Sequence, residues 1–391
     1  MPDAEVIKQE GTPFVIAGTT PIFDLTAYEP LDRAVLMERI QKVRAEMGPK
    51  LLILGHHYQR DEILDLTDLR GDSYGLSEQA AGNEQCRAIV FCGVHFMAET
   101  ADILANRPER LAERGGQRVP VILPSMDAGC SLADMADLEQ VESCWAELAE
   151  VIDINDVTPI TYVNSTAKLK AFCGRHGGIV CTSANARAAL EWAFQRRSRV
   201  LFFPDQHLAR NVARAMGVPL SQMPLWDAHQ GRLGGNSVET IRTARVILWR
   251  GFCCVHQKFL PEDVNDLRAK HPDIRIMVHP ECMMEVADLA DMIGSTSKII
   301  REVEHAPRGT RWAIGTEPHL VDRLRREHTE QAIQLLSSVA RICMTMYRIN
   351  LPRLCWAVEN LAAGTPVNIV EVEPETAHWA LEALRRMLAV K

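Results

Sequence analysis

The sequence lacks the features that would place it in a membrane or on nucleic acid. No apolar run approaches the roughly 18–20 residues that a membrane-spanning helix needs. Basic residues are in the minority, because 43 Lys and Arg stand against 51 Asp and Glu and give a net charge of −8. A broad nucleic-acid surface needs clustered basic residues. We therefore expect neither a membrane nor a nucleic acid as a partner.

Leader and metal-finger motifs are missing too. The N-terminal segment MPDAEVIKQEG has no basic start and no apolar centre, so it does not resemble a signal peptide, and we expect a cytoplasmic protein with reduced thiols. The 11 cysteines contain no C-x-x-C, which counts against a structural zinc site and a thioredoxin-type pair. The cysteines are therefore either buried apolar side chains or ligands.

Length and patterning indicate several α/β units. At about 150 residues per domain, 391 residues correspond to roughly 2.6 domains. Short apolar runs alternate with helical segments, which is typical of buried parallel strands in βα units. These runs are 51–55, 89–94, 120–124, 159–163, 178–182, 200–204, 245–249, 274–279 and 311–316.

The runs fall into three groups, so the fold class we expect is α/β. We predict three similar small parallel-sheet α/β sandwich domains in a pseudo-threefold arrangement around a central active-site cavity. The predicted boundaries are an N-terminal extension and helix at 1–48, α/β domains at 49–131, 132–253 and 254–343, and C-terminal helices at 344–391 that pack back on the first domain.

Polar residues follow nearly every apolar run. In parallel sheets the carboxyl ends of the strands are where ligands bind. One such residue is often only a helix cap or turn residue, but their accumulation after the runs of all three units predicts a polar cavity. There is no G-x-G-x-x-G and no G-x-x-x-x-G-K-[ST], so a dinucleotide or nucleoside-triphosphate site of the usual kind is not expected. A small anionic metabolite suits hydroxyl-rich strand ends better.

Three cysteines stand apart from the others. Cys130, Cys253 and Cys343 each lie near the carboxyl-terminal rim of one predicted unit. Three thiolates brought together by pseudo-threefold packing would hold one face of a 4Fe–4S cluster and leave one iron open. The alternative is that they are small buried hydrophobes, which is the interpretation for Cys92, Cys173, Cys181 and Cys355.

An ordered set of motifs resembles the bacterial quinolinate synthase (quinolinate synthase A) family over about residues 50–360. The motifs are HHYQ (56–59), GDSYGLS (71–77), FCGVHFMAETA (91–101), AGCSLADM (128–135), TYVNSTAKLKA (161–171), CTSANA (181–186), FFPDQHLARNV (202–212), WRGFCCVH (249–256), HPECMMEVADLAD (279–291), GST (294–296), IGTE (314–317) and CMTM (343–346).

The resemblance implies an enzyme of NAD biosynthesis, a transferase that condenses iminoaspartate (iminosuccinate) with dihydroxyacetone phosphate to quinolinate, releasing phosphate and water. It implies one 4Fe–4S cluster per chain, held by Cys130, Cys253 and Cys343, whose open iron acts as a Lewis acid. It also implies functional coupling to an aspartate oxidase or dehydrogenase, because iminoaspartate is unstable.

Carried over by motif, the resemblance also assigns individual residues. Glu281 is the expected general base, with His279, Tyr58 and Tyr162 relaying or orienting protons. The expected substrate contacts are His56, Ser73, Tyr162, Asn164, Ser183, His256, His279, Glu281, Ser295 and Thr296.

One departure and two alternatives stay open. Some family members carry C-x-x-C-x-x-C at the third ligand, whereas this chain has Ser337, Ala340 and Cys343, so no local disulfide forms there. Cys254 and Cys282 adjoin a ligand and a catalytic loop without an assigned role. A non-catalytic iron–sulfur sensor is one alternative, although no basic DNA-reading helix is visible. An aconitase-like hydro-lyase is the other, although it gives no reason for the HPEC and GST motifs.

Overall fold

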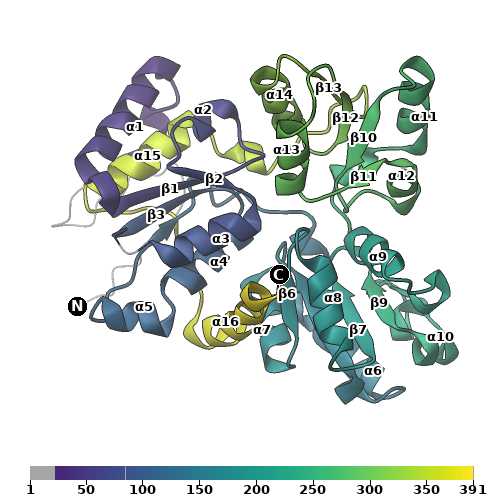
Figure 1. The fold of residues 1–391 in the computed structure, drawn as a ribbon. Helices are drawn as coiled ribbons and strands as arrows, with labels where there is room; N and C mark the ends of the chain where they lie inside the picture. The colour runs from purple at the N-terminus through teal and green to yellow at the C-terminus, as the bar shows by residue number, and fades with distance from the viewer. Residues whose placement is uncertain (1–22, 84, 391) are drawn as a thin grey trace. The chain divides into compact units, whose positions relative to one another are not determined.

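The chain forms two compact units, each built from two stretches of sequence (Figure 1). Unit 1 comprises Met1–Gly129 and Met344–Val372, and unit 2 comprises Cys130–Cys343 and Glu373–Lys391. The computed structural model describes residues 23–83 and 85–390, so the first 22 residues of the expected N-terminal extension lie outside the described residues. Three mostly parallel sheets with helical connections confirm the α/β class. The pseudo-threefold arrangement and the three-domain boundaries stay predictions.

Unit 1 is organised around a five-stranded sheet of order β14-β4-β3-β1-β2. Its strands are β1 (Leu51–His56), β2 (Leu69–Gly71), β3 (Ala88–Cys92), β4 (Val121–Ile122) and β14 (Ile369–Val370). Every residue of the inner strands β1 and β3 is buried, which explains their unbroken apolar runs. The pairing of β14 with β4 is antiparallel, and the other pairings of this sheet are parallel.

Helices pack around this sheet. They are α1 (Arg33–Met47), α2 (Asp61–Leu64), α3 (Ser73–Gly82), α4 (His95–Ala105), α5 (Pro108–Glu113) and α15 (Leu351–Ala362), with 3₁₀ turns η1 (Leu25–Ala27), η2 (Gly48–Lys50) and η8 (Met346–Arg348). Helix α1 ends before Gly48 as predicted, and the φ of +53° at Gly48 suits glycine. Helix α15 packs on α1, where Arg39 Nε lies 2.8 Å from Glu359 Oε1.

Unit 2 contains a fully parallel five-stranded sheet of order β6-β5-β7-β9-β8. Its strands are β5 (Val157–Tyr162), β6 (Ile179–Cys181), β7 (Arg199–Phe203), β8 (Leu225–Trp226) and β9 (Val246–Trp249). The helical segments among them are η3 (Ala133–Met135), α6 (Leu138–Ala149), η4 (Ile154–Asp156), α7 (Ala167–Arg175), α8 (Ala186–Phe194), α9 (Gln206–Ala215), η5 (Leu220–Gln222), η6 (Arg232–Gly235) and α10 (Val238–Thr243).

A second parallel sheet of unit 2 has the order β11-β10-β12-β13. Its strands are β10 (Arg275–Val278), β11 (Met292–Ile293), β12 (Arg311–Gly315) and β13 (Ala332–Leu335). The helical segments around it are η7 (His256–Lys258), α11 (Pro261–Lys270), α12 (Met284–Leu289), α13 (Thr296–Glu304) and α14 (Pro318–Glu327). A core cluster that includes Ile276, Cys282 and Ala313 fills the space beside this sheet.

The last helix does not pack where the sequence led us to expect. Helix α16 (Pro374–Ala389) packs on α7 of unit 2 and not on the first α/β domain (Figure 1). The physical reason is a close helix contact at Gly174, where an added Cβ would overlap the carbonyl oxygen of Trp379. The guanidinium group of Arg386 also donates to the carbonyl oxygen of Gly178 over 2.6 Å.

Five short strands, β2, β8, β11, β13 and β14, fall outside the apolar runs used for prediction. All five lie at sheet edges. An edge strand needs fewer apolar residues than a central one, so its sequence carries a weaker pattern. In the part of the chain that is described, no helix is both long and apolar enough to cross a membrane.

Candidate active site

Strand ends of both sheets in unit 2 supply one group of buried polar side chains. Tyr162 ends β5, and His279 and Glu281 follow β10. His256 opens η7, which follows β9, and Thr316 follows β12. A parallel sheet aligns the carboxyl ends of its strands, so these positions are the ones where a ligand is expected.

The centre of this group is the contact between His256 and Glu281. Nδ1 of His256 lies 2.7 Å from Oε2 of Glu281, and both residues are 2% exposed. Nε2 of His256 lies 3.2 Å from the hydroxyl oxygen of Thr316. A carboxylate on one ring nitrogen and a hydroxyl on the other fix the orientation of the imidazole.

His279 stacks on His256 with ring centroids 4.4 Å apart and an interplanar angle of 19°. Its Nδ1 accepts the backbone N–H of Glu281 over 3.4 Å, so the proton of the neutral ring lies on Nε2. Burial, and then the neighbouring His256, lower the pKa of His279 to about 3. His279 is therefore neutral near pH 7 and offers an Nε2–H donor.

Glu281 is held in its ionised form. Burial would raise its pKa, but the neighbouring His279 and His256 and the hydrogen bonds from His256 and Tyr162 outweigh burial and lower the pKa. Because His279 is neutral, we attribute most of this effect to the hydrogen bonds from His256 and Tyr162. The result is a buried carboxylate that accepts hydrogen bonds from an imidazole and a phenol.

Cys253 lies beside this carboxylate. One ligand atom from each of Cys253, His256 and Glu281 lies within 4.8 Å of the others, which makes them a candidate metal-binding group. Cys130 also interacts electrostatically with Glu281 and with Cys343. The three cysteines predicted as ligands thus belong to the same unit, and two of them, Cys130 and Cys253, interact with Glu281.

The three cysteines share one local structure. Each lies three residues before a 3₁₀ helix, namely η3 after Cys130, η7 after Cys253 and η8 after Cys343. The carbonyl oxygens of Cys130 and Cys253 both accept the N–H four residues later, each over 3.1 Å. Their sulfur atoms both accept backbone N–H groups two and three residues later.

This local structure fits a thiolate-bound cluster. Backbone N–H groups directed at sulfur stabilise a thiolate, as does the start of a helical turn. Burial raises the pKa of the Cys130 thiol, so the free thiol keeps its proton and a bound metal would displace it. Three soft sulfur ligands beside His256 and Glu281 suit iron–sulfur chemistry better than a hard cation.

Cys254 and Cys282, which the sequence left open, differ from each other. Cys254 is exposed, and its contact with the Cys253 thiol lowers its pKa, with a further hydrogen bond from Ser131. Cys282 is fully buried in the core beside the second sheet, where its thiol donates to Gly315 O over 3.7 Å. Cys282 is therefore a packing residue.

The remaining substrate contacts predicted in unit 2 lie at strand and helix ends. Ser295 caps α13 by accepting the N–H of Lys298 over 3.3 Å, and Thr296 is the first residue of that helix. Ser183 and Asn164 are partly buried after β6 and β5. The buried Oδ1 atom of Asn164 has no hydrogen-bond partner among the described residues.

The other predicted residues, His56, Tyr58 and Ser73, belong to unit 1. His56 ends β1, and its Nδ1 accepts the N–H of Tyr58 over 3.1 Å, so the HHYQ segment folds back on itself. The rings of His56 and Tyr58 meet edge to face at 4.7 Å. Ser73 opens α3 directly after the capping residue Asp72. His56 and Tyr58 thus lie at the end of β1, as predicted, whereas Ser73 follows β2, a strand that the sequence did not predict.

Two buried residues of unit 2 had no predicted role. Thr316 contacts His256, and Glu317 is 0% exposed and accepts the N–H of Cys343 over 3.4 Å. Their position directly after β12, within the IGTE motif, was the signal that pointed to them.

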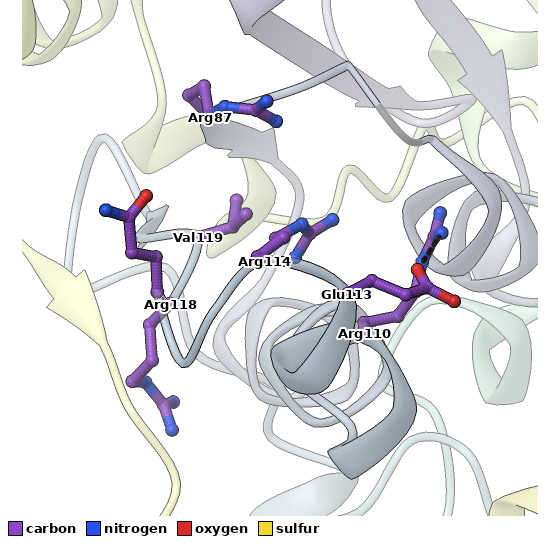
Figure 2. A pocket seen from close by; sticks show the side chains of 7 residues that line it. Arg87, Arg110, Glu113, Arg114, Arg118 and Val119 are labelled. Atoms are coloured by element: carbon purple, nitrogen blue, oxygen red, sulfur yellow. Dashed lines mark hydrogen bonds and ion pairs between the residues drawn. The ribbon is translucent and has the colours of Figure 1, made fainter.

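A separate cavity of about 490 Å³ lies in unit 1 and is lined by basic side chains (Figure 2). Its lining residues are Arg87, Arg110, Glu113, Arg114, Gln117, Arg118 and Val119. Arg110 pairs with Glu113 at 2.7 Å and donates to the carbonyl oxygen at the end of α3, and Arg114 donates to the one at the end of α4. Arginines that cap helix C-termini are structural, so this cavity is not a candidate site.

Comparison with known proteins gives one consistent result. Residues 38–389 match the protein-family model described as Quinolinate synthetase A protein. The quinolinate synthase of Rhodopirellula baltica is 61% identical over 367 residues, which cover 94% of this chain and 94% of that protein. The quinolinate synthase of Nocardioides sp. is 49% identical over 368 residues, covering 92% and 91%. That of Bacillus mycoides is 46% identical over 361 residues, covering 92% and 95%.

Proposed function

Because the chain belongs to the quinolinate synthetase A family, we propose that it condenses iminoaspartate with dihydroxyacetone phosphate to give quinolinate. Phosphate and water are the other products, and the pyridine ring formed is a precursor of NAD. The observation that carries this proposal is the buried Glu281 carboxylate, which is hydrogen-bonded to His256 and Tyr162 and adjacent to Cys253. A condensation followed by dehydration needs such a base next to a Lewis acid.

Cys130, Cys253 and Cys343 are the residues that would hold a 4Fe–4S cluster. Three observations support this assignment: the shared turn, the N–H groups directed at the sulfurs of Cys130 and Cys253, and the interactions of Cys130 with Cys343 and of Cys130 and Cys253 with Glu281. When bound by three thiolates, the cluster supplies an open iron that polarises a substrate oxygen.

The chain's own residues account for proton transfer. Glu281 is ionised and takes a proton at one carboxylate oxygen, while Tyr162 and His256 hold the carboxylate in place. His279 is neutral and offers Nε2–H as a donor to a substrate oxygen. One buried site thus contains an ionised carboxylate that accepts a proton and a neutral imidazole that donates one, which is the combination that acid–base catalysis requires.

Binding of the anionic substrate groups is assigned to the hydroxyl and amide side chains. Ser295 and Thr296 open α13, and the dipole at the start of a helix favours phosphate or carboxylate. Ser183 and Asn164 lie at the strand ends of the other sheet of unit 2. We further propose, from the family resemblance, that His56, Tyr58 and Ser73 of unit 1 are substrate contacts.

The chemistry of the substrate defines the functional partner. Iminoaspartate hydrolyses readily, so an aspartate oxidase or dehydrogenase must supply it nearby. A cytoplasmic location, expected from the sequence, suits both the reduced thiols and this supply.

Anaerobic purification followed by assay tests the proposed function. We expect a brown protein with the broad visible absorbance of an iron–sulfur cluster, and quinolinate formed from iminoaspartate and dihydroxyacetone phosphate. A colourless anaerobic protein with full activity would exclude the cluster. A brown protein that forms no quinolinate would favour a sensor or a hydro-lyase.

A further inference from the structure

The carboxyl end of β12 carries two adjacent, fully buried polar residues, Thr316 and Glu317, each 0% exposed. Part of the role of Glu317 is local, because it is the N-cap of α14 and its Oε2 accepts the N–H of His319 over 2.8 Å. A cap needs only one carboxylate oxygen and is normally solvent-exposed. The burial of Glu317 and the use of its second oxygen therefore need another explanation.

The second oxygen contacts a proposed cluster ligand. Oε1 of Glu317 accepts the backbone N–H of Cys343 over 3.4 Å and lies 2.9 Å from Nδ1 of His319. The segment 337–343 that leads to Cys343 has no helix or strand, and Val339 within it is 52% exposed. Such a segment has little packing of its own to fix its end. The carboxylate thus provides an anchor at the residue whose sulfur must be positioned.

Thr316, the residue before Glu317, makes a similar contact with the segment that carries Cys253, a second proposed cluster ligand. The hydroxyl of Thr316 lies 3.2 Å from Nε2 of His256, and the backbone N–H of His256 donates to the sulfur of Cys253. One dipeptide at the end of β12 therefore contacts the segments of two of the three cysteines. Because β12 is an inner strand of its sheet, this dipeptide starts from a rigid support.

We propose that Glu317 is a positioning residue that holds Cys343 in place for the iron–sulfur cluster, an inference that rests on the proposed function. Its carboxylate links the start of α14 to the segment that carries Cys343, and Thr316 beside it stabilises the turn that carries Cys253. Conversion to an amide leaves one oxygen for donors that now use two, so the amide cannot cap α14 and hold Cys343 as the carboxylate does.

The test compares Glu317→Gln with a matched variant, Glu373→Gln. Glu373 is also a glutamate N-cap followed by proline, and its carboxylate accepts the N–H groups of Glu375 and Thr376, but it is far from any proposed ligand in sequence and exposed. Each protein is purified anaerobically, and iron and sulfide per chain, the rate of iron release to a chelator and the melting temperature of the metal-free chain are measured.

We expect Glu317→Gln to release iron about fivefold faster than wild type, the factor that corresponds to losing one net hydrogen bond. Glu373→Gln should release iron at the wild-type rate, even if both variants lower the melting temperature of the metal-free chain equally. The electron paramagnetic resonance signal of the reduced cluster should change only in Glu317→Gln.

Three outcomes decide the inference. Equal iron release from wild type and Glu317→Gln would overturn the positioning role and leave the proposed function intact. A wild-type chain that holds no iron and sulfide would overturn both. Faster release from both Glu variants would show that lost helix capping, and not the contact with Cys343, controls the cluster.

Discussion

His256 Nδ1 and Glu281 Oε2 lie 2.7 Å apart in a site where both side chains are almost completely buried. The two residues come from segments that follow strands of different sheets in unit 2. A buried carboxylate is stable only if it is paired and hydrogen-bonded, so this contact keeps Glu281 ionised, as its proposed role of general base requires.

Glu281→Gln should retain the cluster and lose turnover. The amide keeps the shape of the side chain but cannot accept a proton, and general-base catalysis is worth about 100-fold or more. Quinolinate formation and iron content are measured in parallel, with Glu285→Gln, an exposed glutamate on the following helix, as the control. Retained turnover in Glu281→Gln would remove this residue as the base.

Tyr162→Phe should shift the pH dependence of the reaction. The Tyr162 hydrogen bond lowers the pKa of Glu281, so its loss raises that pKa. Protonation of the base then begins at a higher pH, and the acid limb of the kcat/KM profile shifts to higher pH. An acid limb at the wild-type pH would show that the phenol does not act on Glu281.

Cys130→Ser, Cys253→Ser and Cys343→Ser should each lose the visible absorbance of the cluster. Cys282→Ser and Cys92→Ser should keep it, because these thiols are buried in the cores beside their sheets. Iron and sulfide analysis of anaerobically purified variants measures the difference. A full complement of iron in any of the first three variants would exclude that residue as a ligand.

His207 should make the chain less stable as the pH falls. Burial, then Arg210, lowers the pKa of His207 to about 4, whereas the unfolded value is 6.5. Between these values the unfolded chain binds one more proton, so the free energy of unfolding falls by about 1.4 kcal/mol per pH unit on acidification and levels off below the folded pKa.

His207→Gln should remove this contribution, and the exposed His305→Gln should not. The free energy of unfolding of the metal-free chain in urea at several pH values gives the comparison. If the free energy of unfolding of His207→Gln varies with pH as it does in wild type, folding does not lower the pKa of His207.

Gly174→Ala should destabilise unit 2 by about 1–3 kcal/mol through overpacking. The added Cβ would meet the backbone of Trp379, so α16 must move away from α7. Gly231→Ala is the matched control, since its φ is −63° and an added Cβ meets nothing within 4 Å. Equal melting temperatures for the two variants would contradict the proposed close contact.

Local sequence patterns were sufficient for the central strands and for the N-terminal helix α1. The run LLILG predicts β1 because a strand buried on both faces must be apolar throughout. Gly48 predicts the end of α1, because the chain there takes a positive φ. The edge strands β2 and β13 escaped prediction because LRG and AIQL carry no continuous apolar pattern.

For the candidate site, local sequence is enough to decide which residue types follow the strands and which turns the cysteines occupy. Those features depend on neighbouring peptide groups, as the N–H bonds to the sulfurs of Cys130 and Cys253 illustrate. Three contacts depend on the folded chain as a whole: that of His256 with Glu281, that of Glu317 with Cys343, and that of α16 with α7. Such partners are separated by tens or hundreds of residues, so their contact depends on how whole βα units pack, which no local pattern encodes.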